Sequence, residues 1–387
     1  MSNVKNAAQQ AEAEHLLQVY AQWSFEPVSA KGVHIQCKEG QLLDLYGGHA
    51  VAALGYSHPT LIKALEHQAN TLFFQSNAVA LDVRAEAARK LADFAPETMN
   101  HVFLVNSGAE ANENALRIAI KHTNRGKVVA IEHGFHGRTA AAGACTWGAK
   151  DNWYAFPNTP FAVDFLPRDQ VNAIDSYIDK DTAAVILEPI QGIAGAYDLS
   201  TDFVQGIAER CKAVGALLIV DEVQTGIGRC GSAFAIELYD VTPDIITTAK
   251  ALGGGFPVGA VIVAEHLKDA VHNGDLGTTF GGGPLACAMI SAVLDVINEE
   301  NLIANVREQT AFLRANLPVG PVVGIQGKGF LTGLICDRPA KEVAAELMKS
   351  NILVGSSSDP KVVRLLPPLT LQREHIQQLL DALADIK

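Results

Sequence analysis

The sequence predicts an α/β fold, in which a large domain is built on a mostly parallel sheet and a smaller domain is α+β. Three observations lead to this prediction. The chain has 387 residues, which is more than one hydrophobic core usually serves. Hydrophobic residues make up 48% and charged residues 19%, as in a compact globular protein. Between about residues 100 and 265, short β-rich runs alternate with helical stretches, which is the pattern of a parallel sheet covered by helices.

The β-rich runs define the strands expected in the large domain. They lie at 101–105, 128–131, 183–187, 216–220, 245–248 and 260–263. Residues 203–214, between two of these runs, place Phe203, Ile207, Cys211 and Val214 on one helical face, as a crossover helix requires.

The pattern changes after about residue 276. A Gly-Gly-Gly-Pro turn leads into a helical stretch at 285–298, which is followed by short mixed strands and a final amphipathic helix. The first part of the chain carries strand signals at 33–37 and 42–45 but no crossover helix. We therefore expect an N-terminal segment, 1–47, that packs with the small domain, a large domain at 48–276, and a small C-terminal domain at 277–387.

The net charge and the hydropathy pattern exclude two kinds of partner. A chain of net charge −12 without a Lys/Arg cluster lacks the basic face that nucleic-acid binding needs. No apolar run approaches the roughly 20 residues of a membrane span. The N-terminus is polar and acidic, unlike a signal peptide, so we expect a cytoplasmic protein.

The cysteines and histidines do not form a metal-binding pattern. The six cysteines contain no Cys-x-x-Cys pair, which fits a reducing compartment and disfavours a zinc site. His133 and His136 in EHGFHGR have metal-like spacing, but no third or fourth ligand is near them in the sequence. The sequence therefore predicts no bound metal.

Polar residues directly follow the predicted strand at 101–105. Ligands collect at the carboxyl ends of strands in an open α/β sheet. Ser107, Gly108 and Ala109 begin a helix there, and the free N–H groups and dipole of a helix N-terminus attract an anion such as a phosphate. The alternative is that Ser107 only caps the helix. Taken by itself, this segment favours the helix cap over a phosphate site.

Asp221 and Lys250 follow two further predicted strands. The strand before Asp221 is apolar, so its buried carboxylate needs a cation, which a protonated pyridine nitrogen would supply. The alternative is an aspartate that caps the next turn. Lys250 precedes a glycine-rich turn, where lysine would form a Schiff base with a carbonyl cofactor; the alternative is a surface lysine. Together with the anion-binding helix N-terminus at residues 107–109, these two residues indicate pyridoxal 5′-phosphate (PLP).

Seven motifs occur along the chain in a fixed order: NSGAEAN, FHGRT, EPIQG, DEVQTGIGR, AKALGGGFPVGA, TTFGGGPLACA and VRLLPPL. From about residue 28 to the C-terminus, the chain resembles the class III aminotransferases of PLP-dependent transferase fold type I. It is most similar to the acetylornithine and succinylornithine aminotransferases. The resemblance implies a large domain with a seven-stranded sheet. LDLYGGHAVAALGYSHP resembles the succinylornithine branch, which is a weaker indication.

The resemblance implies cofactor contacts at the matching positions. The phosphate would be held by Ser107, Gly108 and Ala109, the ring by Phe135, the ring nitrogen by Asp221, the ring hydroxyl by Gln224, and the Schiff base by Lys250. Thr279 would reach the phosphate from the neighbouring subunit, which makes the active unit a homodimer.

The resemblance also implies substrate contacts. Arg138 and Arg364 would each bind a substrate carboxylate, since glutamate has two, and the alternative for either is a structural salt bridge. Thr278 would lie near the substrate. Glu188 would be a buried hydrogen-bond acceptor behind the residues that contact the ligands.

Three departures from the family pattern stand out. Ile193 and Ala194 replace the second glutamate and a glycine of EPIQGEGG, Gly283 replaces an asparagine, and Cys230 replaces a threonine. The glutamate matters most. In relatives it neutralises the arginine that corresponds to Arg364 when an amine donor without a carboxylate at that position is bound.

The resemblance implies a ping-pong reaction in which the terminal amino group of an N-acylated ornithine passes to 2-oxoglutarate. The products would be a semialdehyde and glutamate, as in arginine biosynthesis, with Lys250 as the proton shuttle. Other activities stay open, namely those of a 4-aminobutyrate, ornithine or aminoadipate-semialdehyde aminotransferase, or of an aminomutase. A non-catalytic PLP-fold binding protein is a more distant alternative.

Overall fold

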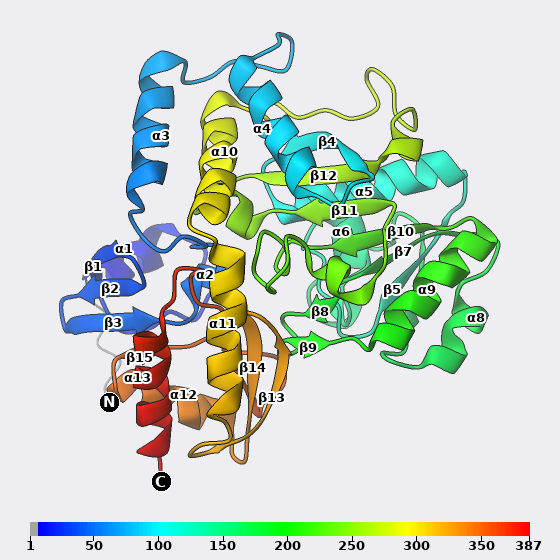
Figure 1. Ribbon diagram of the computed structural model, residues 1–387. Coiled ribbons are helices and arrows are strands. Elements are labelled where there is room, and N and C mark those ends of the chain that lie inside the picture. The colour runs from blue at the N-terminus through cyan, green and yellow to red at the C-terminus, as the bar shows by residue number, and fades with distance from the viewer. Residues whose placement is uncertain (1–6) are drawn as a thin grey trace.

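Seven strands form the central sheet of the computed structural model, which describes residues 7–387 (Figure 1). In spatial order they are β4 Met99–Val105, β12 Gly259–Ala264, β11 Ile245–Thr248, β10 Leu217–Asp221, β7 Thr182–Leu187, β5 Lys127–Ile131 and β6 Ala162–Leu166. β12 is antiparallel to both of its neighbours, and every other adjacent pair is parallel. The predicted mostly parallel, seven-stranded sheet is therefore confirmed.

The six predicted β-rich runs coincide with six of these strands, and β6 was missed. β6 lies at the edge of the sheet, and of its five residues only Leu166 is fully buried. An edge strand needs less apolar sequence than a central one, because one of its sides and part of its faces meet solvent.

The strands bury both faces of the sheet, and their residues alternate between two hydrophobic clusters. Val128 and Ala130 of β5 pack in one cluster with α5 (Gly108–Thr123). Val129 and Ile131 of the same strand pack in the other cluster with α9 (Thr201–Val214). This period of two is what a pleated strand covered on both faces requires.

The predicted crossover helix is confirmed as α9. Phe203, Ile207 and Cys211 of this helix are buried, and Val214 packs against the same cluster with partial exposure. The helix ends at Gly215, which adopts a left-handed conformation with φ of 72°.

The N-terminal strands share a sheet with the C-terminal part of the chain. β1 Pro27–Lys31, β2 His34–Cys37 and β3 Gly40–Asp44 form antiparallel pairs, and β15 Ile352–Leu353 adds to β3 in parallel. Leu366 N donates a hydrogen bond to Leu45 O at 2.7 Å. Figure 1 shows these blue strands beside the orange and red C-terminal elements.

Two further small sheets complete the strands. They are β13 Val322–Lys328, β14 Leu331–Cys336 and β16 Val362–Leu365 in one sheet, and β8 Ile190–Gln191 and β9 Tyr197–Asp198 in the other. The other α-helices are α1 Ala7–His15, α2 Gly47–Ala50, α3 Pro59–Thr71, α4 Asp82–Phe94, α6 Ala140–Ala144, α7 Ala149–Asn152, α8 Ile174–Tyr177, α10 Pro284–Glu299, α11 Leu302–Ala315, α12 Ala340–Lys349 and α13 Arg373–Ala384. Within residues 7–387, no helix combines the length and the apolar character needed to cross a bilayer.

Candidate active site

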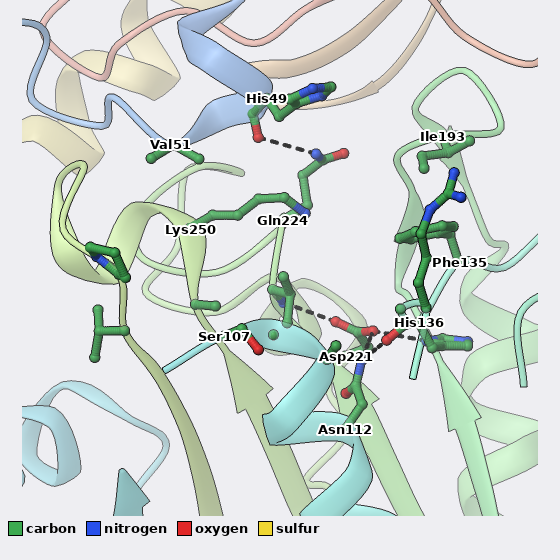
Figure 2. Close-up of a pocket in the computed structure, with 18 of the residues that line it drawn as sticks. His49, Val51, Ser107, Asn112, Phe135, His136, Ile193, Asp221, Gln224 and Lys250 are labelled. Atoms are coloured by element: carbon green, nitrogen blue, oxygen red, sulfur yellow. Dashed lines mark hydrogen bonds and ion pairs between the residues drawn. The ribbon is translucent and has the colours of Figure 1, made fainter. Parts of the chain in front are cut away.

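A cavity of about 590 Å³ opens at the carboxyl ends of β10 and β11, beside the N-terminus of α5 (Figure 2). It brings together ten of the predicted site residues from distant parts of the chain: Ser107, Gly108, Ala109, Phe135, Arg138, Glu188, Asp221, Gln224, Lys250 and Arg364. Its place in the sheet is the one at which α/β folds bind ligands.

The first turn of α5 forms one wall of the cavity. Ser107 is the N-cap, and its Oγ accepts a hydrogen bond from Glu110 N at 3.2 Å. The amides of Gly108 and Ala109 lie in the first turn, where no preceding helical carbonyl exists to accept from them. A Cβ on Gly108 would lie 2.7 Å from the side chain of Val223, so only glycine fits this close approach. Ser107 is thus a helix cap, and the wall is also suited to an anion.

Asp221 is held rigidly at the floor of the cavity. It is buried, and it accepts hydrogen bonds from Asn112 Nδ2 at 2.7 Å, His136 Nδ1 at 2.8 Å and Val223 N at 3.0 Å (Figure 2). Thr247 Oγ1 donates to Asn112 Oδ1 at 2.6 Å, which fixes the asparagine in turn. The carboxylate therefore has a single orientation.

Lys250 follows β11 and projects into the same cavity. Its backbone has a φ of 30°, which is unusual for a residue with a side chain and lies in a region found at functional sites. Within residues 7–387, the Lys250 amine forms no hydrogen bond or ion pair. Burial lowers the pKa of Lys250, against the opposing effects of Asp221 and Glu188. The lowered pKa favours the neutral form of the amine, and the absence of a partner among the described residues leaves that amine free to react.

Arg364 is a buried cation that lacks a carboxylate partner. It lies on β16 and is 4% exposed. Its Nε donates to Ser356 O, and its Nη1 donates to Gly192 O at 2.9 Å and Gln224 Oε1 at 3.4 Å. Among the residues that the structure describes, all its hydrogen-bond acceptors are therefore neutral oxygens, and Ile193, at the position where the family resemblance predicts a glutamate, lines the cavity.

Gln224 lies between Arg364 and the N-terminal part of the chain. Its Nε2 donates to His49 O at 3.3 Å (Figure 2), while its Oε1 accepts from Arg364 Nη1 at 3.4 Å. A Cβ on Gly192 would lie 1.8 Å from Gln224 Oε1. Gly192 must therefore stay glycine for Gln224 to occupy this position.

Arg138 and Glu188 also reach the cavity from the side of β5 and β7. The exposed Arg138 guanidinium lies 4.7 Å above the ring of Trp153. Glu188 is buried and accepts hydrogen bonds from Phe135 N at 2.8 Å and Gly192 N at 3.2 Å. Glu188 thus holds the backbone of both the phenylalanine and the glycine that contacts Arg364.

Thr278 and Thr279 do not line this cavity in the single chain. Thr278 Oγ1 accepts from Asn106 Nδ2 at 3.2 Å, and Asn106 itself lines the cavity. Thr279 is exposed to solvent. These are the two predicted site residues that one chain does not bring to the others.

The comparisons with known proteins agree with this geometry. The model of the family described as aminotransferase class-III matches residues 19–386. This chain belongs to the class III aminotransferases. It is 40% identical to the acetylornithine aminotransferase of Methanopyrus kandleri, over 95% of this chain and 96% of the relative. It is 38% identical to the succinylornithine transaminase of Salmonella newport, over 96% of this chain and 94% of the relative.

A solved structure shows the same fold. The ornithine aminotransferase of Toxoplasma gondii ME49 superposes with a TM-score of 0.90 at 29% identity, covering 99% of this chain and 95% of the other. The predictions of the family, of fold type I and of a PLP-dependent transaminase are therefore confirmed.

The residues of this class III aminotransferase fit PLP. The free amides at the start of α5 suit a phosphate, and Ser107, Gly108 and Ala109 at this helix end line the cavity. Asp221 is a buried carboxylate that can pair with a ring cation, and Lys250 is an unpaired amine in the same cavity. The chain therefore offers a matching group for the phosphate, for the ring nitrogen and for the aldehyde of PLP.

Sequence reasoning missed several residues of this aminotransferase site. Asn112 and His136 bind Asp221, although His136 had been weighed only as a metal ligand. No group of three or more metal-ligating side chains occurs within residues 7–387. His49 lines the cavity from α2, where residues 47 to 50 all have φ between 55° and 69°. The two consecutive glycines of LYGGHA were the only local signal of this left-handed turn.

Proposed function

We propose that this aminotransferase moves the terminal amino group of an N-acylated ornithine to 2-oxoglutarate, giving a semialdehyde and glutamate. One observation carries the proposal: the reactive Lys250 shares a single cavity with two arginines, Arg138 and Arg364. A reacting amine and two carboxylates can therefore be held in one site. The acetylornithine and succinylornithine types among the relatives support this class of donor.

PLP, when bound, supplies the electron sink that stabilises negative charge on the substrate carbon. We assign its phosphate to Ser107, Gly108 and Ala109, its ring to Phe135 and Gln224, and its ring nitrogen to Asp221. Asn112 and His136 orient Asp221 and keep its carboxylate available for a cation.

Lys250 acts as base and acid at its Nζ atom. The neutral amine would accept the proton from the substrate carbon at Nζ and would later release it from the same atom, and burial favours that neutral form by lowering the pKa of Lys250. Lys250→Ala should show no transamination and no cofactor fixed to the chain by borohydride, as measured by mass spectrometry. Fixed cofactor in this variant would place the attachment at another residue.

The unpaired Arg364 makes a succinyl donor the better substrate in this proposal. Ile193 cannot neutralise the guanidinium, whereas N-succinylornithine brings a carboxylate of its own, with its α-carboxylate on Arg138. A charge-assisted hydrogen bond contributes roughly 1.5–3 kcal/mol, so we expect at least about a tenfold preference for the succinyl over the acetyl donor.

The test measures kcat/KM for N-succinylornithine, N-acetylornithine and ornithine in the wild type, Arg364→Ala and Ile193→Glu. The succinyl preference should disappear in Arg364→Ala and decrease in Ile193→Glu. An equal or better rate with N-acetylornithine in the wild type would leave acetylornithine as the donor. No rate with any of the three would overturn the proposed class of donor.

We also propose a cytoplasmic homodimer that serves arginine biosynthesis and shares its active sites between subunits. The exposure of Thr279, outside its own cavity, supports a role at the site of a second copy. Refolding Lys250→Ala together with an inactive Thr279 variant should restore activity, because one of the two mixed sites would be intact. Heterodimers without activity would place Thr279 elsewhere.

A further inference from the structure

Among the residues that the structure describes, Arg364 has no carboxylate hydrogen-bond partner, yet a carboxylate lies in the same cavity. Glu188 lines the cavity with Arg364 and is only 6% exposed. The two side chains bind opposite ends of one residue. Glu188 Oε2 accepts from Gly192 N at 3.2 Å, and Arg364 Nη1 donates to Gly192 O at 2.9 Å.

Glu188 has no cationic partner of its own in the part of the chain that the structure describes. Its two hydrogen bonds come from the backbone amides of Phe135 and Gly192, and no lysine, arginine or histidine forms an ion pair with it. A buried carboxylate in this position remains free to respond to the charge of whatever occupies the site.

We propose that Glu188 is the charge partner of Arg364 in this enzyme: a larger fraction of it is ionised when no substrate carboxylate is bound to Arg364, and that fraction decreases, with uptake of protons from solvent, when one binds. This inference rests on the proposed function, because it concerns how one site accepts both an amine donor and a dicarboxylate. Glu188 acts as a positioning residue and takes no part in proton transfer to the substrate.

The electrostatic surroundings of Glu188 support this role. Burial and, second, the Asp221 carboxylate raise the pKa of Glu188 to about 7, against the opposing effects of His136 and the two amides. Lys250 and Arg364 also face this carboxylate, since Glu188 raises the pKa of both. A group that is half ionised near neutral pH changes its protonation when a further negative charge arrives nearby.

The size of the effect follows from linkage. If a bound carboxylate raises the pKa of Glu188 by about one unit from 7, the protonated fraction at pH 7 rises by about 0.4. The same shift makes dicarboxylate binding about fivefold weaker at pH 8 than at pH 6.

Glutarate is a suitable probe, because it carries the two carboxylates of 2-oxoglutarate and has no keto group to react. Calorimetric titration of the PLP-loaded enzyme at pH 7, in two buffers of different ionisation enthalpy, gives the number of protons taken up. We expect about 0.4 proton per glutarate in the wild type and none from this source in Glu188→Gln, whose glutarate affinity should vary little between pH 6 and 8.

Glu222→Gln is a matched control. Burial also raises the pKa of Glu222 to about 7, but Glu222 does not line the cavity and accepts hydrogen bonds from Ala235 N and Ile236 N. This variant should keep the wild-type proton uptake. Loss of the uptake in both variants would show that buried carboxylates in general, and not Glu188, respond to the ligand, which would overturn the proposal.

The outcomes separate this inference from the proposed function. No proton uptake in the wild type, or an unchanged uptake in Glu188→Gln, overturns the inference even if acylornithine is transaminated. Uptake that depends on Glu188 in an enzyme that turns over no acylornithine supports the inference and overturns only the proposed donor. If Glu188→Gln does not fold, an absence of uptake in the wild type still overturns the inference, and uptake that Glu222→Gln retains supports it.

Discussion

The floor and the substrate end of the cavity hold buried charge in different ways. Asp221 at the floor accepts three hydrogen bonds, one of them from His136, and the chain fixes its orientation before any ligand binds. Arg364 at the substrate end is equally buried but has only carbonyl and amide oxygens as partners. The proposed function explains this difference by the ligands: the floor would meet one unchanging cofactor ring, whereas the substrate end would accept molecules that differ in charge.

The largest expected effect concerns the floor. In the proposed function Asp221 keeps the pyridine nitrogen of PLP protonated, so we expect single-turnover transamination to slow by about 10³-fold or more in Asp221→Ala. Asn112→Ala leaves the carboxylate and removes one hydrogen bond, and we expect a loss of only about tenfold. Equal losses in the two variants would mean that the geometry of the floor matters more than its charge.

At the substrate end we expect a smaller effect that falls on binding. Arg364→Ala removes the partner of one 2-oxoglutarate carboxylate, so KM for 2-oxoglutarate should rise by roughly 10- to 150-fold, which corresponds to 1.5–3 kcal/mol. Arg364→Lys keeps the charge and should lose less. If kcat fell and KM stayed constant in steady-state kinetics, Arg364 would belong with the fixed floor instead.

The smallest expected effect separates burial from function. Glu222 follows Asp221 directly and lies outside the cavity, with its pKa raised by burial from 4.5 to about 7. The folded chain therefore holds a proton between these values that the unfolded chain has lost, so wild-type stability falls as pH rises through this window. Relative to Glu222→Gln, the wild type should lose up to about 3 kcal/mol, or a few degrees in Tm, between pH 5 and 8. A constant difference in thermal unfolding across this range would show that Glu222 is ionised throughout.

The central sheet could be predicted because its strands are buried on both faces. Residues 183–187 and 216–220 read as continuous apolar runs, and each ends in a polar residue that marks the ligand edge of the sheet. Asp221 and Lys250 were found at such strand ends, whereas Glu188 was identified through the family resemblance. β6 was missed because an edge strand tolerates exposed residues such as Asp164.

The hydrogen bonds at the substrate end of the cavity could not be predicted from local sequence. Arg364 binds Gly192 and Gln224, which lie 172 and 140 positions away, and no pattern in either segment encodes that approach. His136 was weighed as a metal ligand because its spacing from His133 was the only visible feature. Its real partner, Asp221, is 85 residues distant. The family resemblance identified Arg364 and the replacement of a glutamate by Ile193. Only the structure shows that the hydrogen-bond acceptors of Arg364, among the described residues, are all neutral oxygens.

The pairing of β3 with β15 has a consequence for how the chain folds during synthesis. Gly40–Asp44 is made early, but the strand that completes its sheet, Ile352–Leu353, is made some 300 residues later. During synthesis the central strands can pair with strands that are near in sequence. The hairpins β1–β2 and β2–β3 form earlier, and the side of β3 that will pair with β15 stays unpaired until the C-terminal part of the chain has been made. We expect truncations that remove β15, from about residue 350 onward, to leave the large sheet folded and to expose this N-terminal edge to proteolysis and aggregation.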